Sequence, residues 1–230
     1  MSETFELKII ARIYNKYTGK FGIPRQSGIG KGVMSEIVFE KDFRIDEALR
    51  GIEDYSHLWL IWQFSEAVRD GWRPTVRPPR LGGNKRMGVF ATRSPFRPNS
   101  IGLSSVKLEE VKKLPGKGSV LVVSGADLQN GTPIFDIKPY LAYTDSHADA
   151  IGGFSDDVKD YCLEVAIPPD LLEMISPDDW DDVYSILKND PRPSYHSQPD
   201  REYGFEFGDY EIKFVVKDGI LTVTNIFCPK

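Results

Sequence analysis

Alternation between apolar and polar residues dominates the first two thirds of the chain. A period of two is typical of strands that bury one face, and β-branched and aromatic residues strengthen that assignment. Six segments are predicted as strands: Phe5–Tyr17, Val33–Glu40, His57–Phe64, Met87–Thr92, Ile101–Val111 and Val120–Gly125. Between them, Asp46–Gly51 predicts one short helix that ends at its glycine. Successive strands with so little helix predict a mainly β fold whose antiparallel sheet closes on itself.

The hydrophobic pattern changes after about residue 148, where the small, glycine-containing stretch Asp149–Ser155 predicts a linker. Beyond it, Ser176 as N-cap, followed by Pro177 and a run of acids, predicts the start of a helix. Asp218-Gly219 between two alternating runs is a strong hairpin signal. Strands are predicted over Tyr161–Ile167, Tyr203–Phe207, Tyr210–Val216 and Leu221–Phe227. We therefore expect two domains, residues 1–147 with the closed sheet and residues 148–230 with a small α+β fold.

Composition is that of an ordinary globular protein. The chain has 230 residues, 40% of them hydrophobic, which is enough to bury a core without disulfides or metals. Cys162 and Cys228 lie far apart in the sequence, which favours a reduced pair over a disulfide, and neither His147 nor His196 has a partner at metal-ligand spacing. The N-terminus lacks the pattern of a signal peptide, and the longest apolar run, Leu58–Trp62, is too short to span a bilayer. We expect a cytoplasmic protein with no metal and no membrane partner.

Charge is segregated along the chain. The formal net charge is −5, yet Trp72–Asn99, the basic segment, contains seven Lys or Arg residues and no acid. By contrast, Asp145–Leu187 contains twelve acids and one base. A basic surface on an acidic body favours an anionic partner at one place, and arginine binds phosphate and stacks on bases better than lysine does. Because Trp72 and Phe96 offer stacking faces, the basic segment predicts a surface for RNA or another anionic substrate.

The segment RQSGIGKG, from Arg25 to Gly32, has the glycine content of a phosphate-binding loop but not its spacing. A P-loop would need glycine at position 25 and serine or threonine at position 32. The glycine spacing also fails the dinucleotide-binding fingerprint, so the glycines alone indicate an ordinary loop. Pro24-Arg25-Gln26 is more informative, because a proline-stiffened loop that presents a guanidinium and an amide can bind a small polar ligand.

A second polar cluster lies in DLQNGTPIFDIKPY, from Asp127 to Tyr140. Gly131-Thr132-Pro133 predicts a tight turn that exposes backbone amides. Turn chemistry and a surface ion pair would account for these residues. The alternative is proton transfer, for which the unranked candidates are Asp136, Lys138 and Tyr140.

Four stretches of the chain match a known pattern when taken together. They are PRQSG at Pro24, YSHLW at Tyr55, GWRPTVRPPRLGGNKRMGVFATRSPFRPNSIG ending at Gly102, and DLQNGTPIFDIKPY. With them the chain resembles the TsaA-like family, also called the TrmO type, over nearly its whole length, and DPRPSY at Asp190 is similar to the C-terminal domain of bacterial members. The chain departs from the family at Ser100, where proline is usual.

The resemblance implies an enzyme that uses S-adenosylmethionine to methylate N6 of threonylcarbamoyladenosine 37, beside the anticodon of tRNA. It implies an antiparallel β-barrel in place of a Rossmann fold, and a homodimer. By the family pattern, the cofactor-binding residues are Pro24, Arg25, Gln26, Phe64, Ser65, Arg93, Leu103, Gly131, Thr132, Pro133 and Ile134.

The same resemblance predicts that the basic segment binds tRNA. Its cations are expected to bind the anticodon loop, and either Arg93 or Arg97 to meet the threonyl carboxylate. The predicted substrate-binding residues are Arg77, Arg80, Lys85, Arg86 and Arg97. Two alternatives stay open: a β-barrel that binds RNA without turnover, and a methyltransferase of a small anionic metabolite.

Overall fold

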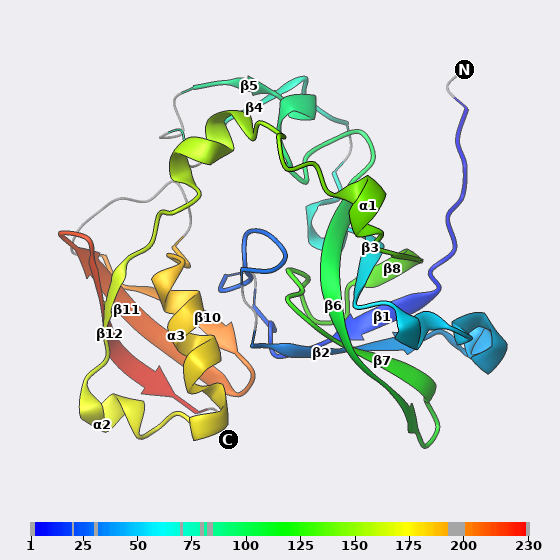
Figure 1. The fold of residues 1–230 in the computed structure, drawn as a ribbon. Helices are drawn as coiled ribbons and strands as arrows, with labels where there is room; N and C mark the ends of the chain where they lie inside the picture. The colour runs from blue at the N-terminus through cyan, green and yellow to red at the C-terminus, as the bar shows by residue number, and fades with distance from the viewer. Residues whose placement is uncertain are drawn as a thin grey trace.

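Six antiparallel strands form a closed ring, the main body of the protein (Figure 1). The computed structural model describes residues 3–19, 21–29, 32–69, 71–78, 81, 85–192 and 201–228. The ring strands are β1 (Ala11–Tyr14), β2 (Met34–Phe39), β3 (His57–Gln63), β6 (Ile101–Leu114), β7 (Gly118–Ser124) and β8 (Pro133–Pro139). They pair in the order β1-β2-β7-β6-β3-β8, and β8 pairs back with β1, so the predicted antiparallel sheet that closes on itself is confirmed.

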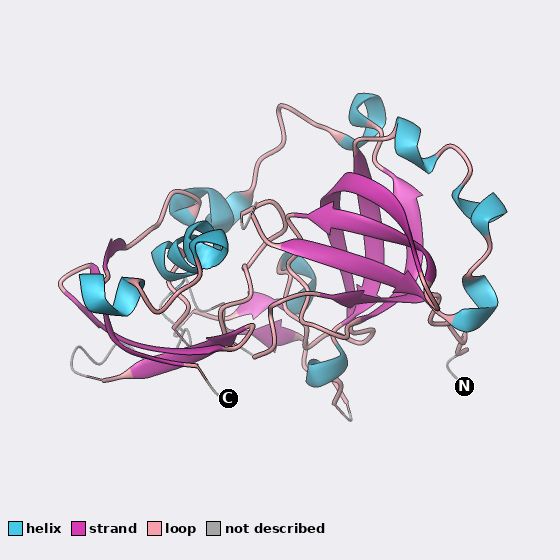
Figure 2. Ribbon diagram, turned by 90° about the horizontal axis from the view of Figure 1, so that it is seen from below, coloured by secondary structure: helices cyan, strands magenta, loops and turns pink. Residues whose placement is uncertain are grey.

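The alternation in the sequence decides which side chains fill the ring. Along β3, Leu58, Leu60 and Trp62 are buried, whereas Trp59 and Ile61 between them face outward and are half-buried. The ring core consists of Ala11, Ile13, Ile37, Phe39, Leu58, Leu60, Trp62, Val106, Leu121, Val123, Ala126, Leu128 and Ile134. Figure 2 shows the ring strands, in magenta, curving past one another on one side of the molecule.

Three strand predictions are only partly correct. Within Tyr161–Ile167 only Glu164–Ala166 forms a strand. Within Phe5–Tyr17 only Ala11–Tyr14 forms a strand, because the earlier residues have no partner strand among the described residues. Met87–Thr92 was expected in the closed sheet, and that is wrong: only Met87–Gly88 is extended, and it pairs with Thr75–Val76 outside the ring. Proline and glycine on both sides break the chain into turns there.

The remaining short elements lie in the connections. The small hairpin is β4 (Thr75–Val76) with β5 (Met87–Gly88), and the short helix is α1 (Ala142–Asp145). The 3₁₀ turns are η1 (Lys41–Phe43), η2 (Asp46–Leu49), η3 (Ile52–Asp54), η4 (Ser65–Ala67), η6 (Val89–Ala91), η7 (Gly153–Val158) and η8 (Pro177–Asp179). The predicted helix at Asp46 is thus a 3₁₀ turn. Among the described residues, no helix has both the length and the apolarity needed to cross a membrane.

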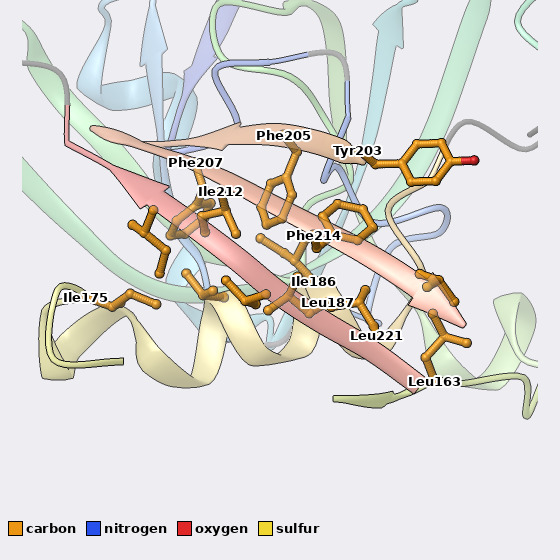
Figure 3. Close-up of a cluster of buried hydrophobic side chains, with 14 of the residues drawn as sticks. Leu163, Ile175, Ile186, Leu187, Tyr203, Phe205, Phe207, Ile212, Phe214 and Leu221 are labelled. Atoms are coloured by element: carbon orange, nitrogen blue, oxygen red, sulfur yellow. The ribbon is translucent and has the colours of Figure 1, made fainter. Parts of the chain in front are cut away.

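A second lobe, residues 161–228, carries its own sheet and core. Its elements are β9 (Glu164–Ala166), α2 (Pro169–Leu172), α3 (Trp180–Lys188), β10 (Tyr203–Phe207), β11 (Tyr210–Lys217) and β12 (Ile220–Phe227). The sheet order is β10-β11-β12-β9, with β9 parallel to β12. Helix α3 buries Val183, Ile186 and Leu187 against aromatic residues of the sheet such as Phe214 (Figure 3). The predicted N-cap Ser176 lies at the expected position, but its side chain makes no capping hydrogen bond.

The connection from β1 to β2 ties the ring to the second lobe. Tyr17 and Val33 leave the ring and belong to the core of the lobe, where the Tyr17 ring meets Phe207 edge-on at 6.0 Å between centroids. The Lys16 carbonyl accepts a hydrogen bond from the Gly208 amide at 2.7 Å, and its ammonium pairs with buried Asp179. The two cores are therefore not independent, because one covalent segment packs into both.

Asp182 is a carboxyl group at this junction whose charged form is disfavoured by its surroundings. Burial and the charge of Asp179 raise the pKa of its carboxyl to about 6, although Lys16 partly offsets both. A side chain on Gly32 would lie 2.0 Å from Asp182 Oδ1, so this carboxylate sits directly against the β1–β2 segment.

We predict that Asp182→Asn stabilises the protein above pH 6 and has little effect near pH 4. A carboxyl whose pKa is raised in the folded state binds its proton more tightly there, so stability falls as the pH rises from about 4 to about 6. Because the group is partly exposed, solvent screening reduces the gain to about 1 kcal/mol, or roughly 2–4 °C in Tm. Thermal unfolding from pH 4 to 8 measures it, with exposed Asp149→Asn as control. Equal pH profiles for Asp182→Asn and the wild type would contradict the assignment.

Candidate functional site

Three connections of the ring emerge at the same end, here called the mouth. In a ring of antiparallel strands, alternate connections lie at opposite ends. The β1–β2, β3–β6 and β7–β8 connections, residues 15–33, 64–100 and 125–132, therefore share one end. The predicted ligand loop at Pro24, the basic segment and the turn at Gly131 come from these three connections, so the topology gathers segments about 100 residues apart.

The ligand loop at the mouth is held by neighbours from the other connections. Gln26 Oε1 accepts a hydrogen bond from Arg93 Nη1, which joins the first connection to the second. The Gly28 amide donates to the Gly125 carbonyl at 2.9 Å, which joins the first connection to the third. Two residues of the predicted cofactor set, Gln26 and Arg93, are thus in contact, although 67 positions separate them in the sequence.

The second lobe holds the same loop from the other side. Arg25 Nη2 donates to the backbone carbonyl of Asp190 at 2.9 Å. Asp190 is buried, has a positive φ of 58°, and accepts two hydrogen bonds from Arg192 at 2.7 and 2.8 Å and one from Tyr161 at 3.0 Å. Burial acts against its charge, but the Arg192 guanidinium prevails and lowers the pKa of Asp190. This charged cluster fixes the carbonyl that Arg25 binds.

Asp127 is the polar group at the centre of the mouth, and the sequence pattern gave it no role of its own. Trp62 Nε1 donates to Ser104 Oγ at 2.9 Å, and Ser104 Oγ donates in turn to Asp127 Oδ1. Burial raises the pKa of Asp127, while the hydrogen bond from Ser104 and the positive charge of Arg93 oppose that rise. A carboxylate kept in such a site at a cost in free energy, beside a cation, is typical of a functional position.

The turn at Gly131 lies at the mouth but does not expose its amides, as had been expected. The Gly131 amide donates to the Ile13 carbonyl at 2.7 Å, and the Thr132 amide donates to the Gln129 carbonyl at 3.1 Å. Thr132, Pro133 and Ile134 are buried. The expectation was wrong because Ile13 of β1 accepts from the Gly131 amide and Gln129, within the turn, accepts from the Thr132 amide, which leaves the turn as support for the mouth.

The remaining predicted cofactor residues lie where β3 and β6 reach the mouth. Phe64 packs against Trp62 with ring centroids 4.2 Å apart, and its amide donates to the Ser100 carbonyl at 2.9 Å. Ser65 is exposed in η4. Leu103 faces outward from β6 and is 57% exposed, an unusual fraction for a leucine in the middle of a sheet.

The three proton-transfer candidates lie together on the outer face of the ring, away from Asp127. Lys138 Nζ pairs with Asp136 Oδ2 at 2.8 Å, and the Tyr140 ring lies 5.4 Å from the Trp59 ring. Trp59 pairs with Lys138, and Ile61 lies between Leu103 and Asp136 in the sheet register. A shallow hollow on this face is lined by Trp59, Ile61, Leu103, Lys138, Thr144, Asp145 and His147. The structure thus brings Asp136 and Lys138 close to Leu103, but it places them on a different surface from Arg93.

The predicted substrate-binding arginine and lysine residues differ in how far they are exposed to solvent. Arg77, Lys85 and Arg86 are exposed on or beside the β4–β5 hairpin, whereas Arg80 lies outside the described residues. Arg97 is half-buried, and its Nη2 donates to the Val89 carbonyl at 3.4 Å and the Thr92 carbonyl at 3.3 Å. The described residues contain no cluster of three or more His, Cys, Asp or Glu side chains that could hold a metal.

Comparison with known proteins agrees with this arrangement. The family model described as tRNA-methyltransferase O N-terminal domain matches residues 12–146, and the model described as TrmO C-terminal domain matches residues 177–227. The chain is 39% identical to the tRNA (adenine(37)-N6)-methyltransferase of Escherichia coli K12, with 94% of each chain covered. It is 36% identical, over 91% of each chain, to a Pseudomonas aeruginosa protein assigned by name to the S-adenosylmethionine-dependent methyltransferases. A crystal structure of TrmO from P. aeruginosa matches with a TM-score of 0.78 at 30% identity and covers 100% of this chain and 99% of that one.

We predict that Gly102→Ala disrupts the mouth. A Cβ at this position would lie 2.3 Å from the Trp62 ring, so the indole that donates to Ser104 has to move. Overpacking of this kind costs about 1–3 kcal/mol, which should appear as a lower Tm and a changed tryptophan emission. Gly88→Ala is the matched control, because a Cβ there has no neighbour within 4 Å. If both variants melt like the wild type, Trp62 is not held as described.

Proposed function

Because this chain belongs to the TrmO family of tRNA methyltransferases, we propose that it transfers a methyl group from S-adenosylmethionine to N6 of adenine 37 in tRNA. The acceptor in this proposal is the threonylcarbamoyl-modified adenosine. The observation that carries the proposal is the convergence of the Gln26 loop, Arg93 and Asp127 at one mouth of the ring. We also propose the division into residues 1–147, a β-barrel, and residues 148–230.

The residues at the mouth fit S-adenosylmethionine in their chemistry. The molecule carries an amino acid end, a ribose with two hydroxyls and an adenine, and when bound it supplies an electrophilic methyl on a sulfonium. Arg93 can bind a carboxylate, Asp127 can accept from hydroxyls, and exposed Leu103 offers an apolar surface for a flat ring. The proposed binding set is Pro24, Arg25, Gln26, Phe64, Ser65, Arg93, Leu103, Gly131, Thr132, Pro133 and Ile134, to which we add Asp127.

Catalysis in this proposal has two parts: alignment of N6 with the methyl group of the cofactor, and removal of the proton from N6. Displacement at a methyl group needs the nucleophile in line with the leaving group, and rigid positioning supplies much of the rate enhancement. N6 of a carbamoylated adenosine is weakly nucleophilic, so a group that accepts its proton assists the reaction. Asp136 is the proposed acceptor, because in the sheet register only Ile61 separates it from Leu103 of the proposed cofactor site. Lys138 pairs with the Asp136 carboxylate, and the Tyr140 ring packs against Trp59.

The basic segment supplies the contact with tRNA. Exposed Arg77, Lys85 and Arg86, together with Arg80, are proposed to bind phosphates of the anticodon loop. Arg97 donates to two carbonyls of its own loop, so it is proposed to brace that loop while Arg93 binds the carboxylate of the cofactor. We propose that the enzyme acts in the cytoplasm, as a homodimer.

The test of the proposed function uses S-adenosylmethionine labelled in the methyl group. Label should pass to tRNA from cells that make the threonylcarbamoyl modification and not to tRNA from cells that lack it. Binding of both ligands without transfer would leave a non-catalytic RNA-binding module. Transfer to small anionic metabolites but not to tRNA would support the metabolite enzyme instead.

We predict that Arg93→Ala weakens cofactor binding about tenfold or more, because a charged hydrogen-bond donor is lost and the Gln26 loop is released. Titration calorimetry measures the Kd for S-adenosylmethionine. Arg50→Ala, an exposed arginine on a different connection of the ring, is the control. An unchanged Kd for Arg93→Ala would remove this residue from the cofactor site.

A further inference from the structure

The segments just before and just after the β4–β5 hairpin present two aromatic rings to solvent. Phe90 is 74% exposed and Trp72 is 48% exposed, and their ring centroids lie 5.9 Å apart at an angle of 38°. Aromatic side chains this large are normally buried, and a pair of them in contact yet open to water indicates a surface kept for a partner.

The backbone around Phe90 is fixed so that this ring stays outside. The neighbouring Val89 is buried, and its amide donates to the Pro74 carbonyl at 2.9 Å. Its carbonyl accepts from Thr92 Oγ1 at 2.9 Å and from Arg97 Nη2 at 3.4 Å. With Val89 anchored inside, the next side chain in the turn points outward, so the exposure of Phe90 is imposed by the local structure.

The charged residues around the two rings indicate which kind of partner they bind. Arg73, Arg77, Lys85 and Arg86 are exposed on the same segment, and the sequence has no acid from Trp72 to Asn99. Phe96, the other aromatic residue that the sequence offered for stacking, is 40% exposed, but the guanidinium of Arg69 already lies over its ring at 4.0 Å from the centroid. Rings set among cations match single-stranded nucleic acid, whose bases stack on aromatic faces while its phosphates bind the cations.

We propose that Trp72 and Phe90 form a stacking platform for an unpaired base of the anticodon loop next to the target adenine, at the position before or after it. The platform rests on the proposed tRNA substrate and adds to it a role in positioning. Phosphate contacts bind every loop alike, whereas a base stacked beside the target fixes how far the target nucleotide is turned out toward the mouth.

The test uses full-length protein and anticodon stem-loops that carry fluorescent 2-aminopurine on either side of the target adenosine. In one of the two stem-loops the wild type should quench the fluorescence by stacking. Phe90→Leu and Trp72→Leu should each weaken binding about tenfold and abolish the quenching, because leucine keeps the apolar surface but not the ring face. Phe90→Tyr should restore both. Phe5→Leu is the matched control, since Phe5 is 78% exposed outside the basic segment.

The outcomes separate the platform from the proposed function. If the wild type transfers label to tRNA while Phe90→Leu and Trp72→Leu bind and quench like Phe5→Leu, the platform is wrong and the function stands. If the wild type transfers no label, the proposed function fails whatever the stem-loops show. If the leucine variants instead change the mass of the protein in solution, the two rings belong to a protein interface, and the proposal is overturned.

Discussion

The pairing of β8 with β1 is the constraint on which the site depends. Without it the six strands would form an open sheet, and the connections at residues 15–33, 64–100 and 125–132 would be spread along one edge. Closure bends this edge into a mouth, so Gln26, Arg93 and Asp127 meet although they lie on three different connections. The site is therefore a property of the ring as a whole, and its polar groups are positioned by strand register.

The mouth contains a carboxyl group, Asp127, whose burial disfavours its charged form. Asp127 is held against the free-energy cost of burial by the Ser104 hydroxyl, the backbone amides of Asp127 and Ser27, and the positive charge of Arg93. Buried ionisable groups of this kind are expensive in a protein interior, and they are typical of functional sites. Elsewhere in the ring, the inward positions are almost entirely apolar. The contrast in chemistry between core and mouth marks the functional end of the molecule.

The second lobe contacts the ligand loop through a backbone carbonyl. Its surface is acidic, which disfavours phosphate, yet the carbonyl of Asp190 reaches the ligand loop and binds Arg25. Tyr17 and Val33 of the β1–β2 connection also pack into the core of the lobe. A change in the lobe is therefore able to reach the mouth along two routes, the Arg25 contact and the β1–β2 segment. The acidic lobe and the basic segment together direct an anionic partner to one side of the protein.

The alternating pattern by itself determined most of the strands, because a residue's face in a sheet follows from local period alone. The cationic, acid-free segment and the family motifs were likewise local, and they sufficed for the enzyme class and the cofactor, while the candidate residues stay a prediction. Tertiary structure decided what depends on contacts between distant segments: that Met87–Thr92 leaves the ring, that the Gly131 amide is bound by Ile13 of β1, and that Asp136 and Lys138 pair beside Trp59 and Ile61 of β3. It also placed the Phe90 ring next to Trp72 and the guanidinium of Arg69 over the Phe96 ring, because ring contacts depend on neighbours that are distant in the sequence.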